Sequence, residues 1–486
     1  MISSSDVLAD YVQLTRVYHT SRLKMLPPIL FASFFVLLYH TAGNAVAFAR
    51  YIVIAGSEPD ADGYYHPNDD VVKVFAIFIL ALVCFFLWVS PRSGLVLSKT
   101  VAAYKIVLLI VLGFWGIAAR NNNEDYKPTK DWGYQDGDQT HSWIQRVSGF
   151  IYVAYSYNGW ENACYVIGQI DKNDSQWRKK IRWGGMVAVF VVSVAYSVLT
   201  LGYYISCEYH DINDNVLHAR DLGIARVFSD KVLHSTRGLA VNVAISGIGN
   251  LVAVVYTQTK VKQAIALHHF MPFSTFFGSE HPFDTPGGAI LLHWMLSTVF
   301  IIATPSNADG YSFIIGLVTY GQLIIAIFVG LGRFRLDKAI LRANLKAAGW
   351  KSWVPSKAIN VSVGLILAVT NCLLLVAAAW PLHDLADNGD KGIPRYYWPM
   401  LLGSCLGAGL IYWCVLRLLQ GSLGRLLGWE WEVKQSKEEN DFQQYIRITR
   451  RDGTEDRYHN RVIDNTFADA ISRGWYGFWE WLNKTL

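Results

Sequence analysis

The sequence of 486 residues has few charges for its length. Asp, Glu, Lys and Arg make up only 17% of it, whereas 52% of the residues are hydrophobic. Soluble proteins of several domains are rarely so apolar, and here the apolar residues are clustered in long runs. One crossing of the hydrocarbon core takes about 20 apolar residues in a helix. The runs therefore predict membrane-spanning helices and not the core of a soluble enzyme.

The sequence also lacks the motifs of several kinds of site. Its six cysteines form no CxxC pair and lie in apolar runs or at their ends, which argues against a disulfide framework or a zinc site. There is no HExxH spacing, no phosphate-binding GxxxxGK loop and no serine nucleophile elbow. The residues thus give no support to an enzyme, a metal site, a cofactor or a nucleic-acid interface.

Ten apolar stretches are long enough to be interpreted as spans. They predict an all-α polytopic membrane protein with about ten transmembrane helices. We expect a cytoplasmic N-terminal segment (1–28), a transmembrane domain (29–419) and a cytoplasmic C-terminal tail (420–486). The seventh span is short for a bilayer, so its ends are the least defined. The ten expected spans are 29–49, 71–89, 101–119, 149–170, 187–205, 239–256, 289–303, 313–331, 361–380 and 398–419.

The charges of the loops orient these spans. Segments 172–182 and 333–357 are rich in Lys and Arg, whereas every charge in the loop 58–70 is acidic. Because positively charged loops stay on the cytoplasmic side, this pattern predicts that both termini are cytoplasmic. The loop 58–70 is then expected outside.

The chain turns polar beyond residue 420. Segment 442–448 alternates weakly between polar and apolar residues, so it is either a short strand or part of a mobile tail, and composition favours the tail. Trp475, Trp479 and Trp481 near the end suit a helix that lies against the membrane surface, or packing against inner loops.

The fourth span, 149–170, places polar groups in the middle of the membrane. Asn158 and Gly159 favour non-helical backbone, and a carboxylate such as Glu161 costs a few kcal/mol at this depth. Backbone that leaves the helix inside a membrane must line a cavity. The span therefore predicts a discontinuous helix whose free N–H and C=O groups suit a zwitterionic substrate. The alternative is that Glu161 and Asn162 hydrogen-bond to a neighbouring helix.

Two other spans carry smaller polar patches. In the sixth, Ser246 and Asn250 offer hydrogen bonds beside glycines that permit close helix packing. In the first, His40 lies beside Thr41 and near Asn44. An imidazole can titrate near neutral pH, although a structural histidine is the simpler interpretation.

Residues 155–166, Tyr-Ser-Tyr-Asn-Gly-Trp-Glu-Asn-Ala-Cys-Tyr-Val, resemble the sixth-helix motif of L-type amino-acid transporters, and most closely that of fungal methionine permeases. Segments 249–261 and 282–294 look like the same fungal group, and the likeness spans roughly residues 10–420. This family belongs to the amino acid, polyamine and organocation superfamily. Its members have twelve spans and an inverted repeat with the leucine-transporter fold.

The resemblance also matches each span to a helix of the family. Because the fourth span here matches family helix six, the ten spans correspond to family helices three to twelve. The first two family helices would then be absent, and with them the Gly-rich break that binds the carboxylate and amino groups of the substrate in the family.

The function implied by the resemblance is secondary active transport of amino acids, by alternating access around an unwound helix at 155–161. Tyr155 would be the aromatic gate, and proton coupling would use Glu161 or His40. The residues that the resemblance places at the substrate are Tyr155, Tyr157, Asn158, Gly159, Trp160, Glu161, Ser246 and Asn250.

The expected partners are an amino-acid substrate, a coupled proton and the lipid bilayer of the plasma membrane. The alternative interpretation is a truncated, transport-incompetent membrane protein with a sensing or structural role, or an incomplete gene model. Reading the sequence upstream of Met1 for two further apolar spans decides between them.

Overall fold

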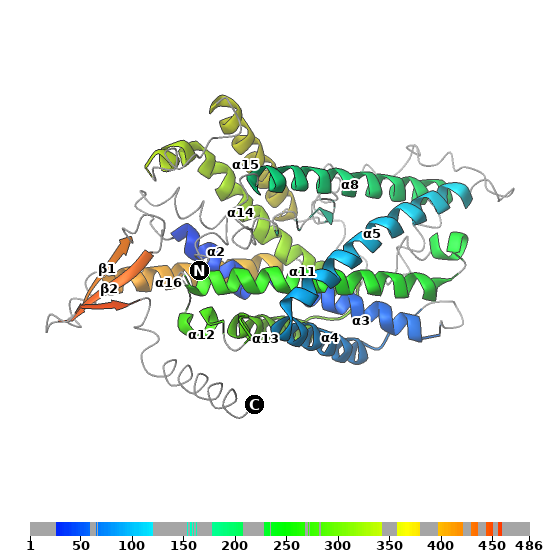
Figure 1. Ribbon diagram of the computed structural model, residues 1–486, viewed down its shortest axis with the longest axis horizontal. Helices are drawn as coiled ribbons and strands as arrows, with labels where there is room; N and C mark the ends of the chain where they lie inside the picture. Colours follow the sequence, from blue (N-terminus) through cyan, green and yellow to red (C-terminus); the bar gives the residue numbers. More distant parts are fainter. Residues whose placement is uncertain are drawn as a thin grey trace.

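The computed structural model shows a bundle of long helices with a small sheet near the C-terminus of the chain (Figure 1). The residues that the structure describes are 26–58, 65, 67–119, 153, 156, 157, 159, 162, 177–207, 228–233, 235–267, 271, 273–280, 283–342, 357–379, 397–420, 429–435, 444–450 and 455–458.

The helices fall where the apolar runs predict them. Their bounds are α2 Leu26–Leu37, α3 Ala42–Gly56, α4 Asp69–Val89, α5 Pro91–Ala119, α8 Trp177–Ser206, α11 Thr236–Leu267, α12 Ser274–Gly278, α13 Gly287–Ala303, α14 Ala308–Arg342, α15 Lys357–Ala379 and α16 Tyr397–Gln420. A π-helical turn, η5, covers Ser229–Leu233.

Six stretches in the described part are long and apolar enough to cross a membrane. They are Pro28–Gly56, Asp69–Val89, Pro91–Ala119, Trp183–Ser206, Thr236–Leu267 and Gly310–Gly332. Three shorter apolar helices are Gly287–Ala303, Val361–Val376 and Pro399–Val415. All of them coincide with expected spans, which confirms an all-α polytopic membrane protein. The remaining expected span, 149–170, lies mostly outside the described residues.

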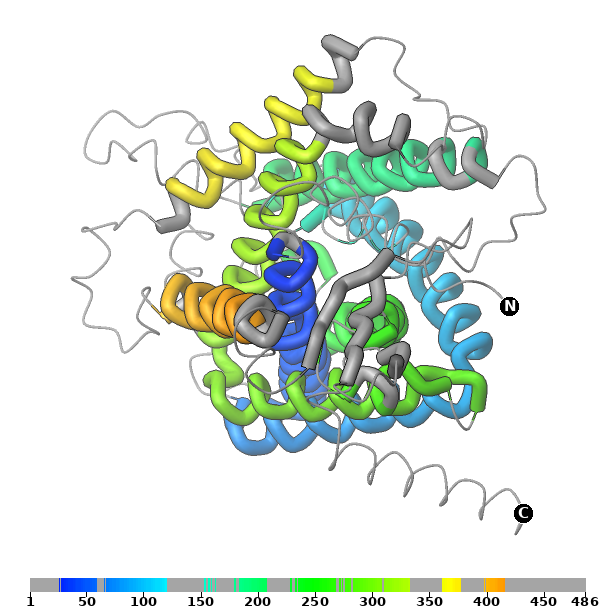
Figure 2. Tube along the Cα trace, turned by 90° about the vertical axis from the view of Figure 1, so that its left-hand side faces the viewer, coloured from blue at the N-terminus to red at the C-terminus, as the bar shows by residue number. Residues whose placement is uncertain are grey.

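Helix α11 is the centre of the bundle and packs against α3, α4, α5, α12 and α13. Nearly every residue from 255 to 266 is buried, so this half of α11 is enclosed on all sides. Figure 2 shows α2 in the middle of the bundle, between α16 and α11. By contrast, large apolar side chains such as Phe78 and Phe190 are exposed on outer helices, as they are on a surface that faces lipid.

The first expected span is interrupted, which the sequence analysis did not predict. Helix α2 ends at Leu37, where the N–H groups of Leu38 and Tyr39 both donate to the Phe34 carbonyl, at 2.9 and 3.1 Å. Helix α3 begins at Ala42. The four residues 38–41 are all buried, so the chain breaks its helix inside the bundle and not at its surface.

Two glycines allow the backbones of α5 and α8 to approach closely where the helices cross. A Cβ on Gly113 would lie 2.7 Å from the Val198 carbonyl, and a Cβ on Gly202 would lie 2.7 Å from the Gly113 oxygen. Both distances are shorter than any normal contact, so the two backbones can approach this closely only without side chains. This contact holds α8 against α5, and α8 in turn contacts Ser156 and Tyr157 of the fourth span.

The C-terminal segment contains three antiparallel strands in the order β1, β2, β3: Trp429–Gln435, Gln444–Arg450 and Glu455–Tyr458. The register pairs Val433 with Ile446, and Ile446 with Tyr458. The stretch 442–448 is therefore mostly strand, as β2. The favoured prediction of a tail without regular structure is wrong for these three segments, because the alternation of 442–448 marks one strand of a sheet.

Candidate functional site

The backbone of the fourth span leaves the helix at Gly159. Its φ angle is +111°, which side chains other than that of glycine rarely adopt. The carbonyl of Gly159 accepts a hydrogen bond from the Asn162 N–H at 3.1 Å, and an added Cβ would lie 3.3 Å from the Asn162 side-chain nitrogen. The backbone angle therefore favours glycine here, and a side chain would also make a tight contact with Asn162.

The residues just before Gly159 are tied to α8. The Tyr157 hydroxyl donates to Ser193 Oγ at 3.2 Å, and its ring meets that of Tyr196 edge-on at 5.8 Å. The Tyr196 hydroxyl in turn donates to the Ser156 carbonyl at 3.3 Å. Helix α8 therefore supports the turn on one side. Tyr155, Asn158, Trp160 and Glu161 lie outside the described residues.

Ser246 and Asn250 lie on α11. Asn250 Nδ2 donates to Asn44 Oδ1 on α3 at 3.0 Å, whereas Ser246 is half-buried. The described contacts thus link Asn250 to α3 and Tyr157 to α8, and they do not bring the two predicted parts of the site together.

His40 lies in the break between α2 and α3 and is buried. Its ring stacks on Phe300 of α13, with 3.8 Å between ring centres, and its Nδ1 accepts the N–H of Ala42, the first residue of α3, at 3.3 Å. Its side chain therefore satisfies one N–H group in the first turn of α3. Among the described residues its Nε2 has no hydrogen-bond partner, although it is buried.

Next to His40 lies a polar cluster that the sequence analysis missed: Thr41, Lys262, His293 and Ser297, all with 0% exposure. Lys262 Nζ donates to the Tyr39 carbonyl at 2.9 Å and lies 3.1 Å from His293 Nδ1. On the other side of the ring, His293 Nε2 is 3.0 Å from Thr41 Oγ1. The Thr41 N–H donates to Ser297 Oγ at 3.3 Å.

The boundary expected for the sixth span explains why this cluster was not predicted. The sixth span was predicted to end at 256, which would leave Lys262 in a cytoplasmic loop. The helix instead continues to Leu267, and its buried stretch includes Gln258 and Lys262, four residues apart and hence on one face. The polar run 257–263 belongs to the bundle.

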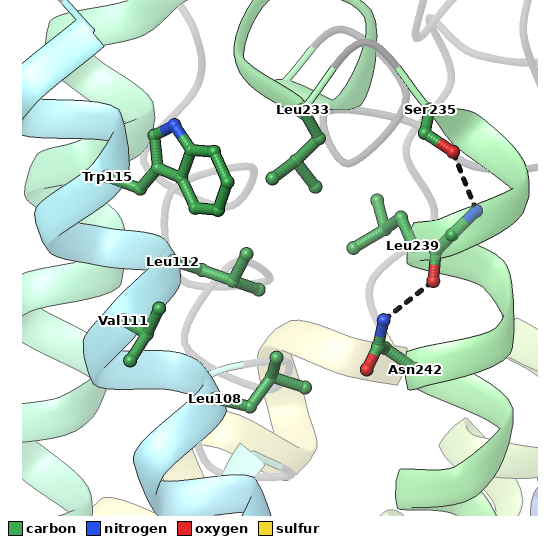
Figure 3. Close-up of a pocket in the computed structure, with 9 residues that line it drawn as sticks. Leu108, Val111, Leu112, Trp115, Leu233, Ser235, Leu239 and Asn242 are labelled. Carbon is green, nitrogen blue, oxygen red and sulfur yellow. Dashed lines mark hydrogen bonds between the residues drawn. The ribbon is translucent and has the colours of Figure 1, made fainter.

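A separate hollow of about 260 Å³ lies between α5, η5 and α11. Leu108, Leu112 and Trp115 face Leu239 across it (Figure 3). Two of its polar groups are tied to α11 and its start: Ser235 Oγ accepts the Gly238 N–H, and Asn242 Nδ2 donates to the Gly238 carbonyl. The lining has no charged side chain, so it suits an apolar group better than a zwitterion.

Residues 3–405 match the amino acid permease family, which is most of the chain. The chain belongs to the amino acid permease family. It is also similar to two curated proteins of Saccharomyces cerevisiae. It is 22% identical to the high-affinity methionine permease, over 366 residues that make up 74% of this chain and 59% of the relative.

The second relative is the low-affinity methionine permease, which is 21% identical over 319 residues, 64% of this chain and 55% of the relative. The chain thus spans less than two thirds of the length of either relative. Together with the apolar helices, family membership establishes an integral membrane protein of a permease family.

Proposed function

We propose that this permease is a secondary active transporter of neutral amino acids of the methionine type, working by alternating access around residues 155–161. The observation that carries the proposal is the φ angle of +111° at Gly159 inside an apolar span. A helix interrupted within the membrane leaves N–H and C=O groups without helical partners, and a substrate's carboxylate and ammonium suit these groups.

In this mechanism Tyr155 gates the site, while Tyr157, Asn158 and Trp160 line it together with the carboxylate of Glu161. Ser246 and Asn250 approach from α11 in the state that closes around the substrate. The relatives' names support methionine as the first substrate to test, because both are methionine permeases.

The test is uptake of labelled methionine by cells that lack their own methionine uptake. Gly159→Val should abolish uptake while the amount at the cell surface stays at the parent level, because valine is strained at positive φ. Gly403→Val on α16 is the matched control, since nothing lies within 4 Å of a Cβ at that glycine. Parent-level uptake in Gly159→Val, or no amino-acid uptake by the parent at the surface, would overturn the proposal.

We also propose a plasma-membrane location with both termini in the cytoplasm, on the charges of the loops. An introduced cysteine at Asp70, which is exposed at the start of α4, should react with an impermeant reagent added outside the cell. A cysteine at Lys346 should react only after the membrane is permeabilised. The opposite pattern would reverse the orientation.

A further inference from the structure

The buried cluster at the break between α2 and α3 is joined to three parts of the bundle. Thr41 lies in the break, Lys262 on α11, and His293 and Ser297 on α13. Each side chain of the cluster is completely buried. A buried lysine is costly unless its charge is compensated, so its partners decide what it can do.

When Lys262 is an ammonium, hydrogen-bond chemistry assigns the protons of the neighbouring groups. An ammonium has only donors, so the His293 Nδ1 at 3.1 Å from Lys262 Nζ must accept. The ring proton then lies on Nε2, which donates to Thr41 Oγ1 at 3.0 Å. The pair therefore carries one positive charge, on Lys262, beside a neutral imidazole. A second proton on Nδ1 would remove the acceptor and break the contact between the two groups.

No carboxylate among the described residues pairs with this charge. On α11 itself the nearest ionised neighbour is Lys260, which lies 3.9 Å from Glu280 and donates to Gln263. The break contributes Tyr39 and His40, of which Tyr39 accepts a hydrogen bond from Gln322 of α14. Helix α13 contributes only His293. The described groups around this single positive charge are thus all neutral.

A second observation points to the same place. Gln258 lies one turn before Lys262 on α11 and is completely buried, and neither polar atom of its side chain has a partner among the described residues. Buried amides are nearly always hydrogen-bonded. An unpaired amide and the unpaired Nε2 of His40 are polar groups able to hold water for a proton that enters or leaves.

We propose that Lys262 and His293 form a proton-binding site that holds one exchangeable proton and couples it to the break between α2 and α3. When the proton is bound, the ammonium donates a charge-assisted hydrogen bond to the Tyr39 carbonyl and one to His293 Nδ1. On release, one Nζ–H bond breaks, the proton passes to water, and the electron pair stays on Nζ.

The neutral amine still has two N–H donors, but its hydrogen bonds are about half as strong as those of the ammonium. The tie between α11 and the Tyr39 carbonyl therefore weakens when the proton leaves. Because α2 and α3 meet at this carbonyl, the break gains freedom relative to α11 and α13. This inference rests on the proposed transport function and names the proton as its coupling ion, at a site other than Glu161 or His40.

The first test uses the purified full chain in liposomes. A pH gradient of one unit sustains about tenfold accumulation of a substrate coupled to one proton. Lys262→Arg keeps the charge but cannot release the proton, so accumulation should fall to about onefold while methionine exchange without a gradient persists. Lys260→Met, two residues away, is the matched control and should accumulate like the parent.

The second test does not depend on transport. Hydrogen exchange of segment 36–44, corrected for intrinsic rates, is followed between about pH 5 and 8 in the parent and in Lys262→Arg, whose guanidinium stays charged over this range. The parent should lose protection as the pH rises, and Lys262→Arg should show no such change. A parent whose protection does not depend on pH would overturn the proposal, and so would tenfold accumulation by Lys262→Arg. Absence of methionine transport in the parent would instead overturn the proposed function alone.

Discussion

Two apolar spans of this protein interrupt their helices, and they do so with different chemistry. At Gly159 the interruption is made by backbone angle, and the neighbouring Tyr157 is only half-buried against α8. Between α2 and α3 the interruption is completely buried and is closed by the side chains of Lys262, His293 and Thr41. The first arrangement rests on a main-chain angle that favours glycine, whereas the second rests on buried polar side chains.

The two interruptions are suited to different roles in transport. A turn that only glycine adopts is suited to direct contact with a substrate, because no side chain stands between the ligand and the main chain. A break held by a buried ammonium is suited to respond to a proton, because its strength depends on charge. The two regions should therefore respond differently to removal of their polar groups.

The largest effect on stability is expected from His293→Leu. This variant removes the imidazole that accepts a hydrogen bond from the completely buried Lys262, so the charge of the lysine is poorly compensated. The free energy of unfolding should fall by about 3 kcal/mol. Thermal unfolding of the purified protein measures it, with Met295→Leu on the exposed face of α13 as the control. An unchanged unfolding temperature would mean that the cluster does not hold the break closed.

Thr41→Val should have a smaller effect of the same kind. Valine keeps the shape of the side chain but removes the hydroxyl that His293 Nε2 needs, while the N–H of residue 41 still reaches Ser297. We expect a loss of about 1 kcal/mol by the same thermal measurement. A loss as large as that of His293→Leu would show that the hydroxyl, and not the lysine, is the main partner of the imidazole.

The smallest effect is expected at the other interruption. Tyr157→Phe removes the hydrogen bond to Ser193 but keeps the ring contact with Tyr196. Because the residue is half-buried, the free energy of unfolding should change by less than about 1 kcal/mol. Thermal unfolding checks this as well, and a loss near that of His293→Leu would remove the contrast between the two regions.

The sequence predicted the helical architecture well, because spans depend on runs of apolar residues that are visible along the chain. It also predicted non-helical backbone at Gly159, because glycine and asparagine both disfavour the helix and stand side by side in this run. Four of the predicted site residues, Tyr155, Asn158, Trp160 and Glu161, lie outside the described part of the structure and stay predictions.

The break after Leu37 and the burial of Lys262 were not predictable in the same way. Both depend on how distant segments pack: Lys262 meets the Tyr39 carbonyl across 223 residues of sequence, and Thr41 meets His293 across 252. Taken locally, a lysine at the end of an apolar run indicates a loop, and a histidine in such a run indicates a structural residue. Only tertiary contact makes them one site.

In the proposed mechanism, the substrate binds at one of these two interruptions and the coupled proton at the other. The most direct test of this mechanism measures methionine exchange and gradient-driven methionine uptake side by side, in liposomes that carry Gly159→Val or Lys262→Arg. Gly159→Val should lose both activities, whereas Lys262→Arg should keep exchange and lose only gradient-driven accumulation. Equal loss of both activities in Lys262→Arg, or exchange at the parent level in Gly159→Val, would contradict the account.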